Sequence, residues 1–144
     1  MSMTSRDIMF NHISTHAASV GFAAPEPLLG YLADMLDYRL TNTELIPEPS
    51  WAERYMEFYH GADARDIREY ADSCLVFVSL LPEYGARRGL SMDYYATLGI
   101  SSYYTVGDLT NDSRMTQLGN WFYYLQKFLN SALHTNQHLE LFKF

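Results

Sequence analysis

Residues 70–82 read Tyr-Ala-Asp-Ser-Cys-Leu-Val-Phe-Val-Ser-Leu-Leu-Pro, and this stretch decides the fold class of the chain. Its apolar side chains recur every three or four residues, the period of a helix that buries one face. Asp63 suits the N-cap of this helix, and Pro82 suits its end. Nearly every other segment has the same period, and no clear strand pattern occurs. The sequence therefore predicts an all-α protein, a compact bundle of about six helices.

The other predicted helices precede and follow this stretch in the sequence. Two of the predicted helices contain an internal glycine, Gly99 or Gly119, which costs about 1 kcal/mol relative to alanine. That cost indicates either close helix contact or room for something against the backbone. The predicted helices are residues 5–20, capped by Ser5 and ended by Gly21; 25–40, with Pro25 and Pro27 in the first turn; 50–60, opened by Ser50 and Glu53; 91–106, capped by Ser91 and closed by Gly107; and 112–133, capped by Asp112.

Length and composition limit the classes of protein to which this chain can belong. A chain of 144 residues predicts one helical domain over residues 1–144, with 1–24 and 134–144 as candidate peripheral arms. The net charge of −7 and the scattered cations argue against nucleic acid and anionic membranes as partners. The one cysteine, Cys74, excludes an internal disulfide. No apolar run approaches the ~20 residues that span a bilayer, and we expect a cytoplasmic protein.

Three segments form a recognisable pattern: Tyr31-Leu-Ala-Asp-Met-Leu36, Ala71-Asp-Ser-Cys-Leu-Val-Phe77 and Asp93-Tyr-Tyr-Ala-Thr-Leu-Gly-Ile-Ser-Ser-Tyr103. They resemble a family of uncharacterised, mainly proteobacterial helical proteins. Its second and third segments read Gly-Asp-x-x-Leu-x-Phe and Asp-Tyr-Tyr-x-x-Met-Gly-x-x-(Ala/Ser)-Tyr. Here Ala71 replaces the glycine and Leu98 the methionine. The resemblance covers residues 28–133. It implies a cytoplasmic bacterial helical protein and transfers no catalytic residue.

The strongest candidate site joins a core helix, a basic turn and a tyrosine-rich helix. A tight turn is predicted for residues 83–89, and an aspartate of the preceding helix can hold an arginine from it. With the tyrosines, these groups would bind a small anionic or planar ligand. The structural alternative, which is favoured, makes the aspartate a pin for the turn and the tyrosines core and rim residues. The candidate residues are Asp72, Arg87, Arg88, Asp93, Tyr94, Tyr95 and Tyr103.

Two histidine pairs have the spacing of metal ligands on a helix. They are His12 with His16, and His134 with His138. Neither pair has an intervening glutamate or an obvious third ligand, so surface histidines are the favoured interpretation and no metal or other cofactor is predicted. Cys74 lies on an apolar helical face, which favours a buried, inert thiol.

Aromatic residues on the last predicted helix indicate association. Trp121-Phe-Tyr-Tyr124 places aromatics on more than one helical face, which a helix that buries one face does not need. We expect a protein partner or self-association, with homodimer and monomer equally open. The predicted function is a non-enzymatic interaction or regulatory module acting through a tyrosine-rich helical surface. The alternative is a small-ligand binder with a pocket at Asp72, Arg88, Tyr95 and Tyr103.

Overall fold

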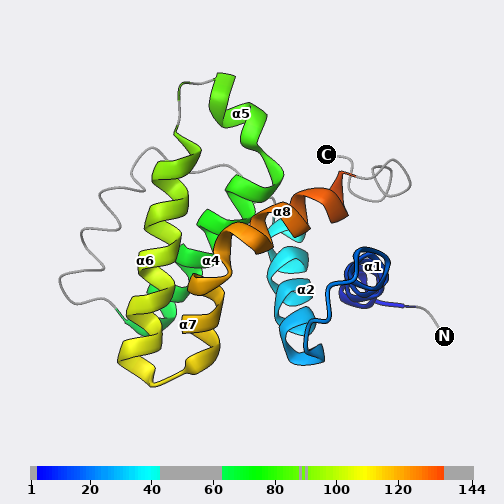
Figure 1. The fold of residues 1–144 in the computed structure, drawn as a ribbon, viewed down its shortest axis with the longest axis horizontal. Coiled ribbons are helices and arrows are strands. Elements are labelled where there is room, and N and C mark those ends of the chain that lie inside the picture. The colour runs from blue at the N-terminus through cyan, green and yellow to red at the C-terminus, as the bar shows by residue number, and fades with distance from the viewer. Residues whose placement is uncertain (1–2, 43–62, 88, 90, 135–144) are drawn as a thin grey trace. The chain divides into compact units, whose positions relative to one another are not determined.

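The computed structural model describes residues 3–42, 63–87, 89 and 91–134, without the side chains of 84–86 (Figure 1). No strand occurs in these residues, so the predicted all-α class is confirmed. The predicted helix over 50–60 lies outside the described residues, as do His138 and Arg88. The described helices are α1 (Ser5–Val20), α2 (Glu26–Thr41), α4 (Ala64–Leu80), α5 (Pro82–Arg87), α6 (Met92–Thr110), α7 (Ser113–Asn120) and α8 (Phe122–Leu133).

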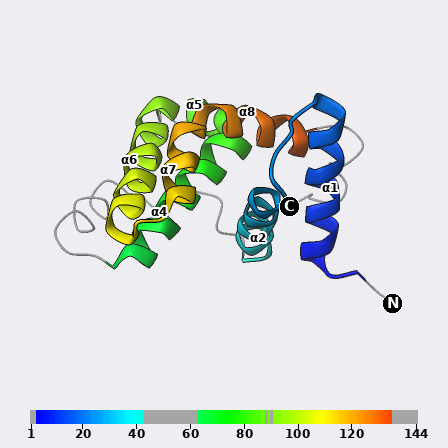
Figure 2. The same cartoon turned by 60° about the horizontal axis from the view of Figure 1, so that its bottom comes forward.

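The chain divides into two units. Unit 1 comprises Met1–Glu44 with Phe128–Phe144, and in it α1 packs against α2 (Figure 2). Unit 2 comprises Leu45–Lys127, and in it α6 packs against both α4 and α7. One boundary between the units falls inside α8. The prediction of a single domain over the whole chain stays a prediction.

Four predicted helix ends are confirmed, and each follows from local chemistry. The side chains of Asp63, Ser91 and Asp112 accept hydrogen bonds from backbone N–H groups in the first turns of α4, α6 and α7. These bonds satisfy donors that a helix start leaves without intrahelical partners. Gly21 ends α1 with a left-handed φ of 75°, a conformation that glycine adopts without steric penalty.

The predicted N-cap of the first helix was wrong by one residue. Thr4, rather than Ser5, is the cap, and it exchanges two hydrogen bonds with Asp7. A capping box needs an acceptor three residues after the cap, which Asp7 supplies to Thr4, whereas Ile8 could not supply one to Ser5. Ser5 is the first helical residue, and its hydroxyl donates to an Asp37 carboxylate oxygen of α2 at 2.6 Å.

The predicted end of α6 at Gly107 was also wrong. The helix continues to Thr110 and ends at Asn111, whose φ is 54°. Gly107 is buried, and a Cβ there would lie 2.5 Å from Thr116 Oγ1 of α7. This glycine therefore allows α6 and α7 to approach each other, and it does not terminate a helix.

Two further elements differ from the predicted ones. Pro82 follows α4 as predicted, but it also begins α5 where a tight turn over 83–89 was expected. Proline suits a first helical position because its missing N–H is not needed there. The predicted helix over 112–133 is divided at Trp121, which stands between α7 and α8.

Three side chains lie on the opposite side from the one predicted. The apolar periods of residues 91–106 and 112–133 include Tyr94 and Trp121 and so predict their burial, but they are 46% and 40% exposed. The period of residues 25–40 places Arg39 away from the apolar stripe, on the solvent side, but it is buried. It lies one turn from the buried Met35 and Leu36, and its long aliphatic stem packs well in an apolar environment.

Candidate functional site

A buried hydrogen bond joins α4 to α6 in unit 2. The Tyr103 hydroxyl donates to Asp72 Oδ1 at 2.6 Å. Tyr103 is 0% exposed and Asp72 is 9% exposed, so the bond lies away from water. A phenol that donates to a carboxylate in such surroundings makes a strong bond, and it offsets part of the free energy needed to bury the carboxylate.

Helices α4 and α6 pack closely enough for this hydrogen bond because Gly99 of α6 faces α4. A Cβ added at Gly99 would lie 2.7 Å from Phe122 Cε2 and 2.9 Å from Cys74 Cβ. Both neighbours are completely buried, and the Cys74 Cβ is fixed to the α4 backbone. Of the two explanations that the sequence left open for Gly99, close helix contact is confirmed. Cys74 is also buried, as predicted.

Tyr95 is half-buried between an apolar ring and an exposed one. Its ring lies edge-on to Phe77, with 5.2 Å between centroids, and edge-on to Tyr94 at 5.4 Å. Burial raises the pKa of the Tyr95 phenol, with smaller contributions from Tyr94 and Cys74. The phenol therefore stays protonated at neutral pH and can act as a hydrogen-bond donor.

The structure brings together some of the predicted site residues. Asp72 contacts Tyr103, and Tyr95 contacts Tyr94. Arg87 is exposed at the end of α5. Because Arg88 lies outside the described residues, the predicted arginine contact with a ligand stays a prediction.

Ring burial at Tyr95 should matter more than its hydroxyl. We expect Tyr95→Ala to lower the free energy of unfolding by about 3 kcal/mol and Tyr95→Phe by about 1 kcal/mol, because phenylalanine keeps the contact with Phe77. Urea unfolding of both variants measures the difference. Equal losses would show that the hydroxyl dominates, and they would favour a ligand-binding role for this ring.

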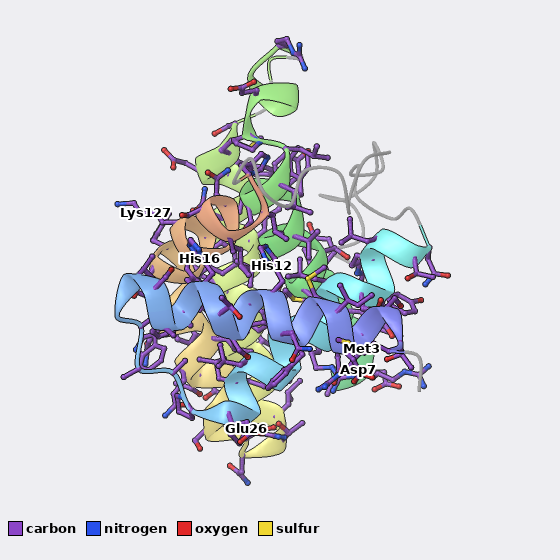
Figure 3. The ribbon with its side chains drawn as sticks, turned by 90° about the vertical axis from the view of Figure 1, so that its right-hand side faces the viewer. Met3, Asp7, His12, His16, Glu26 and Lys127 are labelled. Carbon is purple, nitrogen blue, oxygen red and sulfur yellow. The ribbon has the colours of Figure 1, made fainter. Side chains whose placement is uncertain are left out.

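The histidines of α1 bind residues of α8 within unit 1 (Figure 3). His12 Nε2 is hydrogen-bonded to the Ala132 carbonyl, and His16 Nε2 lies 2.9 Å from Ser131 Oγ. His134 Nδ1 lies 2.8 Å from the Asn130 carbonyl. His12 is buried on the apolar face of α1, where the helical period places it, so the interpretation of the pairs as surface histidines does not hold for this residue. A helix leaves its last carbonyls without intrahelical donors, and His12 supplies a donor to one of them.

No metal centre is assembled by the part of the chain that the structure describes. No group of three or more His, Cys, Asp or Glu side chains there is placed to hold a metal ion. The ring nitrogens named above are in contact with the backbone and with a serine hydroxyl. His12 and His16 thus join α1 to residues 131–132, whereas His134 contacts its own helix.

Exposed aromatic side chains occur on α6 and on the chain around the α7–α8 junction. We call this set the aromatic surface: Tyr94, Tyr104, Trp121, Tyr123 and Tyr124, which are 37–50% exposed. The Tyr104 ring lies against Gly119, where a Cβ would be 2.8 Å from it, and its hydroxyl donates to Asn120 Oδ1 at 2.6 Å. Sequence reasoning missed Tyr104. The sequence contained one indication of its exposure: Tyr104 follows Tyr103, which is buried, and successive helical residues point about 100° apart.

Comparisons with known proteins found no match among family models, curated proteins or solved structures. Among the described helices, none has the length and apolar character required to traverse a lipid bilayer. Any assignment of function therefore depends on the chemistry of the surfaces and the buried pair described above.

Proposed function

We propose that this protein is a non-enzymatic interaction or regulatory module that binds a protein partner through the aromatic surface. One observation carries the proposal: five large aromatic side chains are 37–50% exposed on α6 and around the α7–α8 junction. Tyrosine and tryptophan are enriched at protein interfaces, because each covers a large area with few rotatable bonds. Single exposed apolar side chains are common, but several on one part of a fold are typical of an interaction site.

The surface is held in place by the fold, which favours binding. Tyr104 is fixed at its ring by Gly119 and at its hydroxyl by Asn120, so little side-chain entropy remains to be lost on association. Tyr94 is supported by Tyr95, which in turn packs on Phe77. Rings with these supports bind a partner at a smaller entropic penalty than mobile side chains do.

The proposed setting is the cytoplasm of a bacterium, as the sequence resemblance implies. The partner is another protein or a second copy of this chain, and neither nucleic acid nor membrane is proposed. The net charge of −7 supports the exclusion of polyanionic partners.

Site-specific crosslinking with a matched control tests the proposal. A photo-crosslinking amino acid at Tyr123 in its own host should capture a defined partner, and Tyr94→Ala with Tyr104→Ala should abolish that capture. Tyr38→Ala serves as the control, because Tyr38 is 52% exposed but belongs to α2 of unit 1. Equal capture by all variants, or no captured protein, would contradict the proposal.

A second candidate function rests on the buried Asp72–Tyr103 bond. A carboxylate and a phenol inside a helical core are polar groups that a small ligand could use. Native mass spectrometry of protein from its own host distinguishes this candidate. A bound small mass that Tyr103→Phe removes would replace the interaction proposal with ligand binding. Protein of the mass of the chain alone would count against it.

A further inference from the structure

The outward face of α6 carries aromatic and acidic side chains along its whole length. Asp93, Thr97, Tyr104 and Asp108 are exposed, and at about 100° per residue they fall within an arc of about 60°. Tyr94 is also exposed, about 40° beyond this arc. Asp93 and Asp108 are fifteen residues apart, which is about 22 Å along a helix. We call this set the α6 face.

The negative charge of this face is not neutralised by its own helix. Residues 92–110 contain two aspartates and no lysine or arginine. No ion pair of Asp93 or Asp108 falls within the described residues. The nearest following cation in the sequence, Arg114, already makes two hydrogen bonds to the Asp112 carboxylate, at 3.0 and 2.9 Å. Within the part of the chain that the structure describes, the carboxylates of the α6 face therefore have no cationic side chain paired with them.

We infer that the α6 face binds a peptide segment of the partner that carries arginine or lysine side chains. This inference rests on the proposed function and names the chemistry of its partner. Cations are attracted by carboxylates and by the faces of tyrosine rings, and arginine combines both contacts best. The two aspartates, with Tyr104 between them, suit an extended segment of about seven residues, since a strand-like chain rises about 3.3 Å per residue.

Charge also decides against a second copy of this chain as the occupant. Each copy carries a net charge of −7, so two α6 faces in contact would bring like charges together. Like charges across an interface disfavour association, whereas opposite charges speed encounter and fix register. A cationic segment brings opposite charge to the α6 face, whereas a second copy brings like charge.

The test is fluorescence anisotropy with labelled peptides. The probe is a twelve-residue peptide of alternating arginine and serine, and the comparison is the aspartate–serine peptide of equal length. We expect the arginine peptide to bind and the affinity to fall steeply with salt. Asp93→Asn with Asp108→Asn should weaken binding about tenfold. Glu26→Gln with Glu83→Gln removes the same charge from exposed positions outside the α6 face and should weaken it less than twofold.

Three single variants keep the test independent of folding defects. Asp108→Asn leaves the first turn of α6 unchanged and should weaken binding about threefold by itself. Tyr104→Phe keeps the ring and should bind normally, whereas Tyr104→Ala should bind more weakly. Circular dichroism confirms that each variant is helical before its affinity is compared.

The outcomes separate this inference from the proposed function. Equal weakening by both double variants would show general attraction of a polycation and would overturn the inference. No peptide binding, while the crosslinked partner persists, would overturn the inference and leave the proposed function standing. Loss of both peptide binding and partner crosslinking would overturn the inference and the proposed function together. A concentration-dependent dimer that Tyr104→Ala abolishes would assign the α6 face to a second copy instead.

Discussion

Replacing Tyr103 with alanine should lower the free energy of unfolding by about 4 kcal/mol, a large part of the stability of a typical domain. Tyr103 is 0% exposed, and its ring lies 6.2 Å from that of Phe122, between centroids. Removing the ring leaves a cavity in unit 2 and removes the donor to the buried Asp72 carboxylate. Urea unfolding, followed by circular dichroism, measures the loss.

A double-mutant cycle separates the hydrogen bond from the cavity. Tyr103→Phe keeps the ring and should lower the free energy of unfolding by about 2 kcal/mol, since a bond to a charged acceptor is lost. In the Asp72→Ala background the same substitution should have little effect. Additive losses in the cycle would show that the Asp72–Tyr103 bond makes no net contribution to stability.

Replacing Gly99 with alanine should destabilise the protein by about 2 kcal/mol, although alanine is the better helix former by about 1 kcal/mol. The new Cβ would lie 2.9 Å from Cys74 Cβ, which can move only with the α4 backbone, and 2.7 Å from a buried Phe122 ring atom. The helices must therefore separate, and the packing beside the Asp72–Tyr103 bond must change.

Gly30→Ala is the matched control for this prediction. Gly30 lies in α2, and the atom nearest to its added Cβ is an Arg6 guanidinium nitrogen at 3.2 Å. That nitrogen is the tip of a long side chain, although its ion pair with Asp34 at 2.7 Å restrains it. We expect Gly30→Ala to be neutral or to stabilise by less than about 1 kcal/mol. If Gly99→Ala stabilised as much as Gly30→Ala, the proposed close contact at Gly99 would be wrong.

Three helix starts were predicted correctly from the sequence because one nearby side chain controls each of them. Asp63, Ser91 and Asp112 each cap a helix through a hydrogen bond to a residue two or three positions away, so the sequence contains the whole interaction. The continuation of α6 past Gly107 accompanies close packing between α6 and α7. Such contacts join residues far apart in sequence, which helical period alone does not determine.

The candidate sites were predictable only in part, for the same reason. The helical period of residues 70–82 turns Asp72 toward the core, and the structure adds that the hydroxyl of Tyr103, 31 residues later, donates to it. Tyr94 was placed inward because its neighbours have a helical apolar pattern. The adjacent Tyr95 packs on Phe77 instead, and successive helical residues point about 100° apart. Tyr94 therefore faces water, where it belongs to the aromatic surface.

The division of the chain into units has a consequence for the order in which the protein folds during synthesis. Unit 2 is one continuous stretch, Leu45–Lys127, and its contacts are complete once Lys127 has left the ribosome. Unit 1 draws on both ends of the chain, and the bond from His12 to Ala132 spans 120 residues. Contacts that close so long a loop form late. During translation, α1 and α2 can pack against each other early, but the parts of them that contact residues 128–133 stay uncovered until those residues have emerged.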